Sequence, residues 1–242
     1  MPYPPSLLPV HREHEPCPYL PAETACMPLY IAGRGLSPSD VDRLWAQGYR
    51  RAGFFFYQTQ CPSCRACVPI RLPVDAFRPS RSQRRAWRRA KGSVEVVIHD
   101  PLVDQRRIEL INKHRHQRQL DGGRPPLSTH DYVDFLVQSS CDTREFAYYM
   151  EQRLVGVAIL DVGDDSCSAV YTYYDPDYSY LSLGTFSILN QIEFCQQHGA
   201  RWLYLGFYIA GHPHMAYKAR YRPHELRLDG RWRRVEESVD PT

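Results

Sequence analysis

The sequence predicts an α+β protein in which a cysteine-bearing N-terminal domain precedes a larger domain with a mixed β-sheet. Five of the eight cysteines fall in the first third of the chain, which is also rich in proline. A strongly basic segment follows, and beyond it apolar strand-like runs alternate with amphipathic helical patterns. With 242 residues, of which 43% are hydrophobic, the chain is long enough to bury a substantial core.

We expect three parts: an N-terminal domain over residues 1–77, a basic connector over 78–92, and a sheet domain over 93–242. In the first part, a helix is predicted from Pro38 to Gln47, because Ser37 or Ser39 supplies an N-cap and Gly48 a stop. Apolar, β-branched and aromatic residues predict strands over 49–57 and 68–74.

The sheet domain is predicted to contain several consecutive strands and three helices. Strands are expected over residues 94–99, 146–151, 154–162, 169–174 and 202–207. Helices are expected over 102–120, 130–138 and 185–198, the last ended by Gly199. Helices that alternate with a mixed sheet of mostly antiparallel strands suggest an acyltransferase-like layer architecture.

The composition disfavours secretion and insertion into a membrane. No run approaches the roughly 18 apolar residues of a membrane span, and the first thirty residues mix proline, histidine, arginine and glutamate. We therefore expect a cytoplasmic protein that does not bind membranes. In a reducing cytoplasm, clustered cysteines indicate metal or redox chemistry more often than structural disulfides.

Cys61, Cys64 and Cys67 follow one another at intervals of three residues in a turn-rich segment. Three thiols at this spacing can converge on one soft ion, and Cys17 is our candidate for a fourth ligand. The pattern is consistent with zinc, with an iron–sulfur cluster, or with reduced cysteines that hold nothing.

The basic connector carries seven arginines and lysines and no acidic residue. On a helix its arginines form a wide stripe that suits phosphate oxygens, with Trp87 as the single aromatic residue among them. Without acidic partners the run repels itself, so we favour nucleic-acid binding over an ordinary solvated face. The residues assigned to RNA binding are Arg81, Arg84, Arg85, Arg88 and Arg89.

Two junctions in the sheet domain are candidates for chemistry. The strand-to-helix turn at Gly184 presents backbone N–H groups and a helix N-terminus. It lacks the dense glycine loop that cradles the pyrophosphate of an acyl-CoA, which disfavours that donor. The loop after the last apolar strand is crowded with polar aromatic and basic residues, among them Tyr208, Tyr217 and Lys218.

Several motifs in order resemble the arginyltransferase family of aminoacyl-tRNA–protein transferases, and they span residues 15 to 228. They are CPYLP (17–21), GYRRAG (48–53), CPSCRACVPIR (61–71), FRPSRSQRR (77–85), LGFYI (205–209) and MAYK (215–218). The compact length and the cysteine spacing look like the bacterial branch, the aspartate/glutamate leucyltransferases. That branch transfers leucine from leucyl-tRNA to proteins that begin with Asp or Glu, and so marks them for the degradation machinery of the N-end rule (N-degron) pathway.

The resemblance implies an acetyltransferase-like (GNAT-type) C-terminal domain and a reaction that requires no cofactor. Within that chemistry we expect catalytic roles for Gly184, Tyr208, Tyr217 and Lys218, which would stabilise the oxyanion, orient the ester or relay a proton. For binding of the acidic N-terminus and the donor we expect Arg51, Arg71, Arg50 and Tyr204, because arginine binds a carboxylate through two parallel hydrogen bonds.

Two alternatives remain open at this level. Arginyl-tRNA as donor is disfavoured, because binding of its arginine side chain would require a buried Asp or Glu. No Asp or Glu lies between Tyr204 and Pro223. A non-catalytic RNA-binding or metal-binding module explains the basic connector and the cysteines, but it assigns no function to most of the 242 residues.

Overall fold

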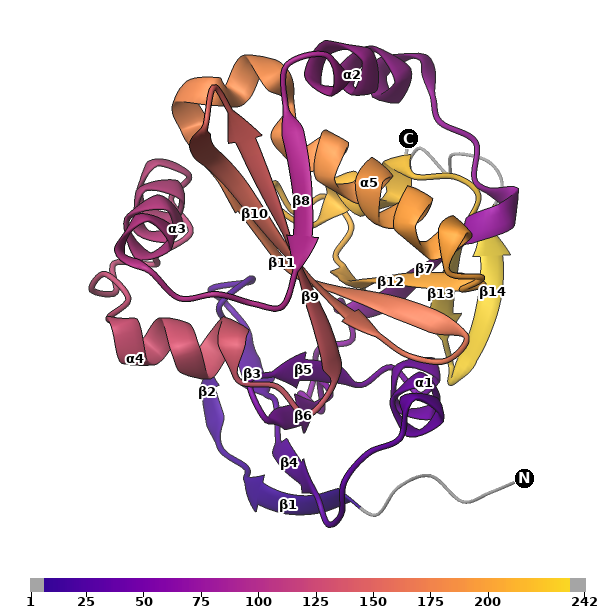
Figure 1. Cartoon of the computed structure of the whole chain (residues 1–242). Coiled ribbons are helices and arrows are strands. Elements are labelled where there is room, and N and C mark those ends of the chain that lie inside the picture. Colours follow the sequence, from indigo (N-terminus) through magenta and orange to yellow (C-terminus); the bar gives the residue numbers. More distant parts are fainter. Residues whose placement is uncertain (1–6, 236–242) are drawn as a thin grey trace.

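An eight-stranded mixed sheet is the centre of the computed structural model, which describes residues 7–235 (Figure 1). Neighbouring strands are antiparallel except β11 and β12, which are parallel. The predicted α+β class with a mixed sheet is thus confirmed. From one edge to the other the strands are β14 (Arg231–Val235), β13 (His224–Leu228), β7 (Val68–Pro73), β12 (Trp202–Tyr208), β11 (Ser166–Tyr174), β10 (Arg153–Val162), β9 (Asp142–Met150) and β8 (Glu95–His99).

Both faces of this sheet are covered by helices. Helix α5 (Leu183–Gln197) packs on one face, with α2 (Arg81–Lys91) against it, and α3 (Gln105–Gln117) and α4 (Thr129–Tyr132) pack on the other. The helical path of α4 continues through a π-helical turn, Val133–Val137. In β9, Phe146 and Tyr148 enter the core under α5, while Ala147 enters the core under α3. Because alternate side chains point to opposite faces, the part of β9 that is covered on both sides, from Phe146 to Tyr148, is continuously apolar or aromatic.

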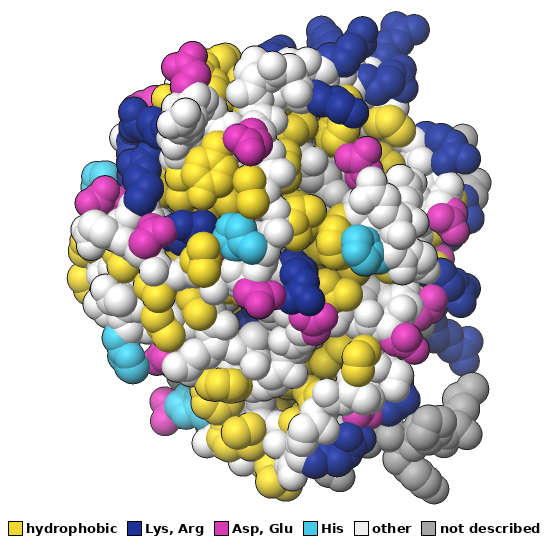
Figure 2. All heavy atoms as spheres, viewed as in Figure 1, with side chains coloured by type: hydrophobic (Ala, Val, Ile, Leu, Met, Phe, Trp, Pro, Cys, Tyr) yellow, Lys and Arg dark blue, Asp and Glu magenta, His cyan; other side chains and the backbone are white. Residues whose placement is uncertain are grey.

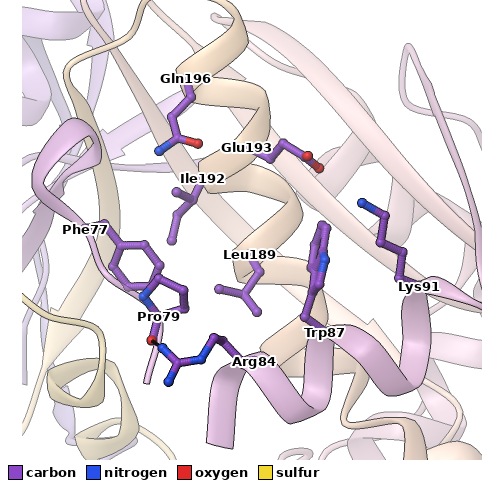
Figure 3. Close-up of a pocket in the computed structure, with 9 residues that line it drawn as sticks. All are labelled: Phe77, Pro79, Arg84, Trp87, Lys91, Leu189, Ile192, Glu193 and Gln196. Carbon is purple, nitrogen blue, oxygen red and sulfur yellow. Dashed lines mark hydrogen bonds between the residues drawn. The ribbon is translucent and has the colours of Figure 1, made fainter. Parts of the chain in front are cut away.

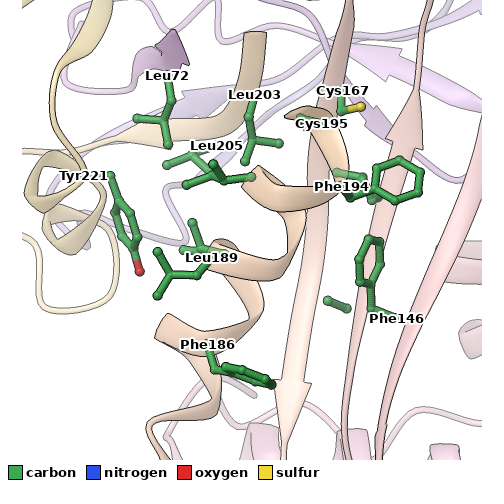
Figure 4. Close-up of a cluster of buried hydrophobic side chains, with 14 of the residues drawn as sticks. Leu72, Phe146, Cys167, Phe186, Leu189, Phe194, Cys195, Leu203, Leu205 and Tyr221 are labelled. Atoms are coloured by element: carbon green, nitrogen blue, oxygen red, sulfur yellow. The ribbon is translucent and has the colours of Figure 1, made fainter. Parts of the chain in front are cut away.

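The core under α5 is the larger of the two clusters that flank the sheet. Figure 4 shows Phe186, Leu189, Phe194 and Cys195 of α5 facing the strands, where Leu203 and Leu205 lie beside Leu72. Cys167 and Cys195 are fully buried there, as expected for small core residues. Helix α5 is therefore closely packed on the large sheet, and this packing fixes the position of its N-terminus.

The N-terminal residues form a smaller, four-stranded sheet with helix α1 (Pro38–Ala46) beside it (Figure 1). Of the two predicted caps, Ser37 is the one that caps α1, and it forms a capping box with Asp40. The strands are β1 (Leu7–His11), β4 (Leu29–Ala32), β6 (Phe55–Tyr57) and β5 (Arg50–Ala52), and a separate pair is formed by β2 (His14–Pro16) and β3 (Thr24–Cys26).

The single strand predicted over residues 49–57 is wrong, because this segment forms the two antiparallel strands β5 and β6. The chain turns at Gly53, whose φ of +59° lies in the left-handed region. A Cβ atom at this position would lie 2.3 Å from the carbonyl oxygen of Asp134, so only glycine fits the turn. Strands β1 to β4, β13 and β14 were not predicted, since three to five residues carry little periodicity.

The large sheet draws on both sides of the domain boundary expected at residue 77. Strand β7 lies between β13 and β12, although it belongs to the segment 1–77. The basic connector is a regular helix, α2, that packs along α5 and is capped by Ser80. Within residues 7–235, no helix has the length and apolar character required to cross a bilayer.

A buried ion pair ties the N-terminal sheet to the large sheet. Nε of Arg51 on β5 donates to Oδ2 of Asp161 on β10 at 2.7 Å, and the two side chains are 1% and 0% exposed. Asp161 also accepts from the Thr143 hydroxyl at 2.8 Å. Burying a charge is tolerated only when it is paired and hydrogen-bonded, so these contacts specify how the two sheets dock.

We predict that Arg51→Met lowers the free energy of unfolding by about 3–5 kcal/mol, because the Asp161 carboxylate stays buried without its partner. Urea denaturation followed by circular dichroism measures this, and Arg51→Met/Asp161→Leu should recover much of the loss. The control is Arg144→Met, whose partially exposed pairs with Asp100 and Asp142 contribute less than about 1 kcal/mol. A loss below about 1 kcal/mol for Arg51→Met would contradict this assignment.

Candidate functional site

The two parallel strands of the large sheet separate near their middle. Ser166–Ser168 of β11 pair with Trp202–Tyr204 of β12, and beyond this point β11 continues with β10 while β12 continues with β7. Gly206 forms a bulge in β12 with a φ of +85°. Beyond this point the two strands are not paired with each other, and we call their separation the opening; β11 runs on to Tyr174, beside the start of α5.

Arg50 occupies the point where the strands separate. Its guanidinium donates to the Ser168 hydroxyl at 2.7 Å and to the carbonyl of Ala169. A Cβ atom on Gly206 would lie 3.3 Å from three guanidinium atoms, so glycine allows the arginine to pack on the strand. Arg50 satisfies the polar groups that the separated strands leave unpaired. It is therefore part of the wall of the opening and is not a free acceptor-binding group.

Tyr174, the last residue of β11, lies beside the first turn of α5. Its ring is 3.4 Å from the position that a Cβ on Gly184 would take. Arg118, at the end of α3, donates to the Tyr174 hydroxyl oxygen. The backbone of Tyr174 is held by Nδ1 of His114, 2.9 Å from its carbonyl oxygen. Because the hydroxyl accepts from Arg118, its own proton is free to be donated elsewhere.

The N-terminus of α5 is not capped by a side chain. Ser182 precedes the helix with a φ of +55°, and its hydroxyl does not accept a hydrogen bond from the first turn. The N–H groups of a helix's first turn have no partners within the helix, and the helix dipole favours negative charge there. Leu183 and Gly184 thus present donors beside the Tyr174 hydroxyl, and the catalytic role expected of Gly184 stays a prediction.

Lys218 is buried near the end of β12. Its Nζ donates to the carbonyl oxygen of Phe207 at 2.6 Å and lies 3.6 Å from the sulfur of Met215. Burial, together with the positive charge of Arg50, lowers the pKa of Lys218 to about 7, while Cys67 opposes the shift. Near neutral pH the amine is therefore divided between its charged and neutral forms.

Aromatic and histidine side chains surround this part of the molecule. The Tyr57 ring packs on Phe207 with centroids 6.0 Å apart, and the Tyr19 ring packs on His212 at 5.9 Å. Tyr217 is 40% exposed, and Tyr208 packs at the rim of the core under α5. The predicted catalytic residues Gly184, Tyr208, Tyr217 and Lys218 all come from the two segments that flank the opening, the start of α5 and the end of β12 with its following loop.

The four predicted metal ligands are brought to one region. Burial raises the pKa of the Cys67 thiol to about 12, and the neighbouring Cys17, Cys61 and Cys64 contribute in the same direction. The backbone N–H of Leu20 donates to the Cys17 sulfur at 3.4 Å. Among the described residues, however, no three of these sulfurs lie within 4.8 Å of one another, so the thiols do not form a closed tetrahedral set. Metal binding stays a prediction.

The arginines expected to bind an acidic N-terminus have partners inside the protein. Arg51 is paired with Asp161 as described above. Arg71 pairs with Glu225 at 2.7 Å and packs with its guanidinium carbon 3.6 Å from the centroid of Trp202. Tyr204 is buried, and its hydroxyl accepts from Arg71 at 3.2 Å. This arrangement speaks against the predicted substrate-binding roles, because Arg51 and Arg71 are already paired with acidic side chains of the fold, although Nη2 of Arg51 is buried without a hydrogen-bond partner.

The predicted RNA-binding arginines are on the surface of α2, where Figure 2 shows Lys and Arg side chains gathered at the top of the molecule. Arg81, Arg84, Arg85 and Arg88 line an open hollow of about 440 Å³, which we call the arginine hollow. No side chain of α2 forms an ion pair within residues 7–235. The surface therefore carries uncompensated positive charge suited to a polyanion.

Tyr174 is a functional candidate that the sequence did not single out, whereas Arg118 is one of the basic residues of the predicted helix 102–120 that the sequence suggests for contacts with an RNA backbone. Both lie at the ends of correctly predicted elements, a strand and a helix, and neither belongs to a recognisable motif. The only local sign of a functional role is that Tyr174 ends a strand and that the next long helix has a glycine in its first turn. Their contact joins residues 56 positions apart, which periodicity does not report.

Known proteins match this chain over most of its length. The chain is 36% identical to the aspartate/glutamate leucyltransferase of Acinetobacter baumannii over 93% of this chain and 83% of that protein. It is 38% identical to the protein of that name from Alkalilimnicola ehrlichii over 93% and 95%. Among solved structures, FemX has a TM-score of 0.49 at 11% identity, over 80% of this chain and 67% of that chain.

Two family models also match. Residues 15–85 match the model described as arginine-tRNA-protein transferase, N terminus, and residues 106–228 match the model for the C terminus. The two matched segments include the cysteine cluster, the first five residues of α2 and the separation of β11 from β12. The chain therefore belongs to the arginine-tRNA-protein transferase family, with the aspartate/glutamate leucyltransferases among its relatives.

Proposed function

We propose that the protein transfers leucine from leucyl-tRNA to the α-amine of proteins that begin with Asp or Glu. Membership of the family supports aminoacyl-tRNA as the donor, and the names of the relatives support leucine and acidic acceptors. The product would carry a new N-terminal leucine that directs the protein to degradation. Since aminoacyl-tRNA is a cytoplasmic metabolite, the proposed reaction belongs to the cytoplasm.

The observation that carries this proposal is the juxtaposition of the Tyr174 hydroxyl with the uncapped start of α5 at the opening in the sheet. In the reaction the acceptor nitrogen bonds to the ester carbon, the bond to the ribose oxygen breaks, and the proton lost by the amine ends on that oxygen. Negative charge develops on the carbonyl oxygen in between. Backbone N–H groups of Leu183 and Gly184, with the Tyr174 O–H, supply donors for that charge.

The chemistry proceeds without a covalent enzyme intermediate in this proposal. The thiol that influences Lys218 electrostatically is that of Cys67, whose pKa of about 12 keeps it protonated at neutral pH. A protonated thiol is a poor nucleophile. Direct attack by the acceptor amine on a positioned ester needs only alignment and charge stabilisation, which together account for large rate enhancements.

Lys218 is the proposed proton acceptor for the attacking amine. With a pKa of about 7, a large share of its side chain is neutral at physiological pH and has a lone pair available. An unburied lysine, with a pKa near 10.4, would remain charged. The tRNA body is proposed to lie along α2, whose arginines face solvent.

Arg118 is proposed to select the acidic acceptor. It is exposed, it lies beside the opening, and it forms no ion pair with an acidic side chain in the described part of the chain. One of its N–H groups serves Tyr174, which leaves the other donors of the guanidinium for a carboxylate.

The direct test is a transfer assay with labelled leucyl-tRNA and arginyl-tRNA and with peptides that begin with Glu, Asp, Ala or Lys. We expect leucine on the Glu and Asp peptides alone. In Arg118→Gln the ratio of kcat/KM between Glu and Ala peptides should fall at least about tenfold, since an ionic hydrogen bond is lost. Arginine transfer would replace the proposed donor, and an unchanged ratio would remove Arg118 from acceptor selection.

We predict that Tyr174→Phe lowers kcat about 100-fold and changes the KM for leucyl-tRNA less than about threefold. Removing one donor to an oxyanion costs roughly 100- to 1,000-fold in kcat. Tyr171→Phe is the matched control, since Tyr171 is on the same strand and contacts Phe135 and Tyr173 through its ring. Steady-state kinetics of both variants test this prediction. Equal kcat values for Tyr174→Phe and Tyr171→Phe would refute the role of the Tyr174 hydroxyl as a donor to the oxyanion.

The pH dependence tests Lys218. Below pH 7 both Lys218 and the acceptor amine, whose pKa is about 8, are protonated. The logarithm of kcat/KM for the acceptor peptide should therefore rise with a slope approaching two in the wild type. In Lys218→Met only the amine titrates, and the slope should be about one. Lys218→Arg, permanently charged, should share that slope at a low rate. A slope of one in the wild type would contradict the assignment.

A further inference from the structure

A second concave site lies away from the opening in the sheet, where α2 crosses α5. We call it the α2–α5 groove; its volume is about 290 Å³. Figure 3 shows Phe77 and Pro79 on one side, Trp87 on the other, and Leu189 and Ile192 of α5 between them. This volume is close to the lower end of the range for small-molecule sites, roughly 300 Å³. The groove is suited to a single flat ring system.

Trp87 provides an aromatic wall whose surroundings are cationic. Its ring is half-buried, packs on Phe186 with centroids 5.2 Å apart, and has Nζ of Lys91 at 5.0 Å from its centre. The contact with Phe186 fixes the indole on α5, so the ring is held rather than free to rotate. A fixed aromatic ring beside cations is the arrangement on which proteins stack unpaired bases.

The far end of the groove is polar and carries hydrogen-bond acceptors. Glu193 is exposed, and its carboxylate makes no hydrogen bond or ion pair with any other residue from 7 to 235. Gln196 uses its amide N–H for the Val74 carbonyl at 3.3 Å, which leaves its own carbonyl oxygen facing the groove's rim. A carboxylate here would repel a phosphate, but it accepts hydrogen bonds from the N–H groups on the edge of a base.

The groove adjoins the arginine hollow through a shared residue. Arg84 lines both, with the groove on one side of it and Arg81, Arg85 and Arg88 on the other. A nucleotide whose base entered the groove would therefore have its phosphate at this cluster. The charges thus favour a ligand that is neutral and flat at one end and anionic at the other.

We propose that the α2–α5 groove binds one unpaired base of the donor tRNA, stacked on Trp87, while the adjoining phosphates lie in the arginine hollow. This rests on the proposed function only in naming the donor tRNA as the RNA. Leu189 and Gln196 follow Gly184 by 5 and 12 residues on α5, which places the base roughly 8–18 Å along the helix from the proposed acyl-transfer site. The base therefore belongs to a nucleotide near the aminoacylated end.

The test uses Trp87→Leu, which keeps an apolar contact and removes the π face, and Trp87→Phe, which keeps a ring. Affinity for uncharged leucine tRNA is measured for both by filter binding at fixed salt. Loss of one stacked base should weaken binding by about tenfold in Trp87→Leu, and Trp87→Phe should stay within about threefold of the wild type. Phe54→Leu, which alters an exposed aromatic side chain of the N-terminal sheet, is the control and should bind normally.

A second measurement separates tRNA binding from damage to the fold and from the chemistry. Leucyl-adenosine, a minimal donor without the rest of the tRNA, should support transfer equally in the wild type and in Trp87→Leu. Unchanged tRNA affinity in Trp87→Leu would overturn the proposal, and so would an equal loss with both donors. If the wild type bound tRNA but transferred no amino acid, the proposed function would fail. The comparison of tRNA affinity between the wild type and Trp87→Leu would still test whether the α2–α5 groove binds a base.

Discussion

Two adjacent arginines on the short strand β5 determine how the protein is assembled. Consecutive strand residues point to opposite sides, so Arg50 and Arg51 enter different parts of the large sheet. Arg51 reaches Asp161 on β10, and Arg50 reaches Ser168 and Ala169 where β11 leaves β12. Buried guanidinium groups must have partners, so the N-terminal sheet has one docking position that satisfies both.

That docking position also creates the opening in which the proposed chemistry takes place. If β11 and β12 stayed paired along their length, Tyr174 and the loop after Tyr208 would be neighbours in a continuous sheet. The side chain of Arg50 under Gly206 instead supports the separated strands. It also places a positive charge beside Lys218, which lowers the pKa of that amine. One buried side chain thereby links the shape of the opening to its electrostatics.

The basic residues of the surface helices α2 and α3 differ in whether they have acidic partners. On α3, Arg107 is paired with Glu145 and Lys113 with Asp175, so those cations belong to the fold. On α2 the cations have no acidic partners among the described residues, and they flank Trp87 and a groove. The basic residues of the two helices thus have different roles, since cations without acidic partners retain long-range attraction for a polyanion.

The sequence by itself determined the elements with regular periodicity, among them α1, α2, α5 and the apolar strands of the large sheet, and its ordered motifs pointed to the family. Those signals are local, because a cap, a period or a motif is read within a few residues. Only the tertiary structure decided that Arg51 pairs inside the fold, that Tyr174 meets Arg118, and that β7 belongs to the large sheet. Each of these depends on a partner tens of residues away, and one arginine looks like another until its partner is known.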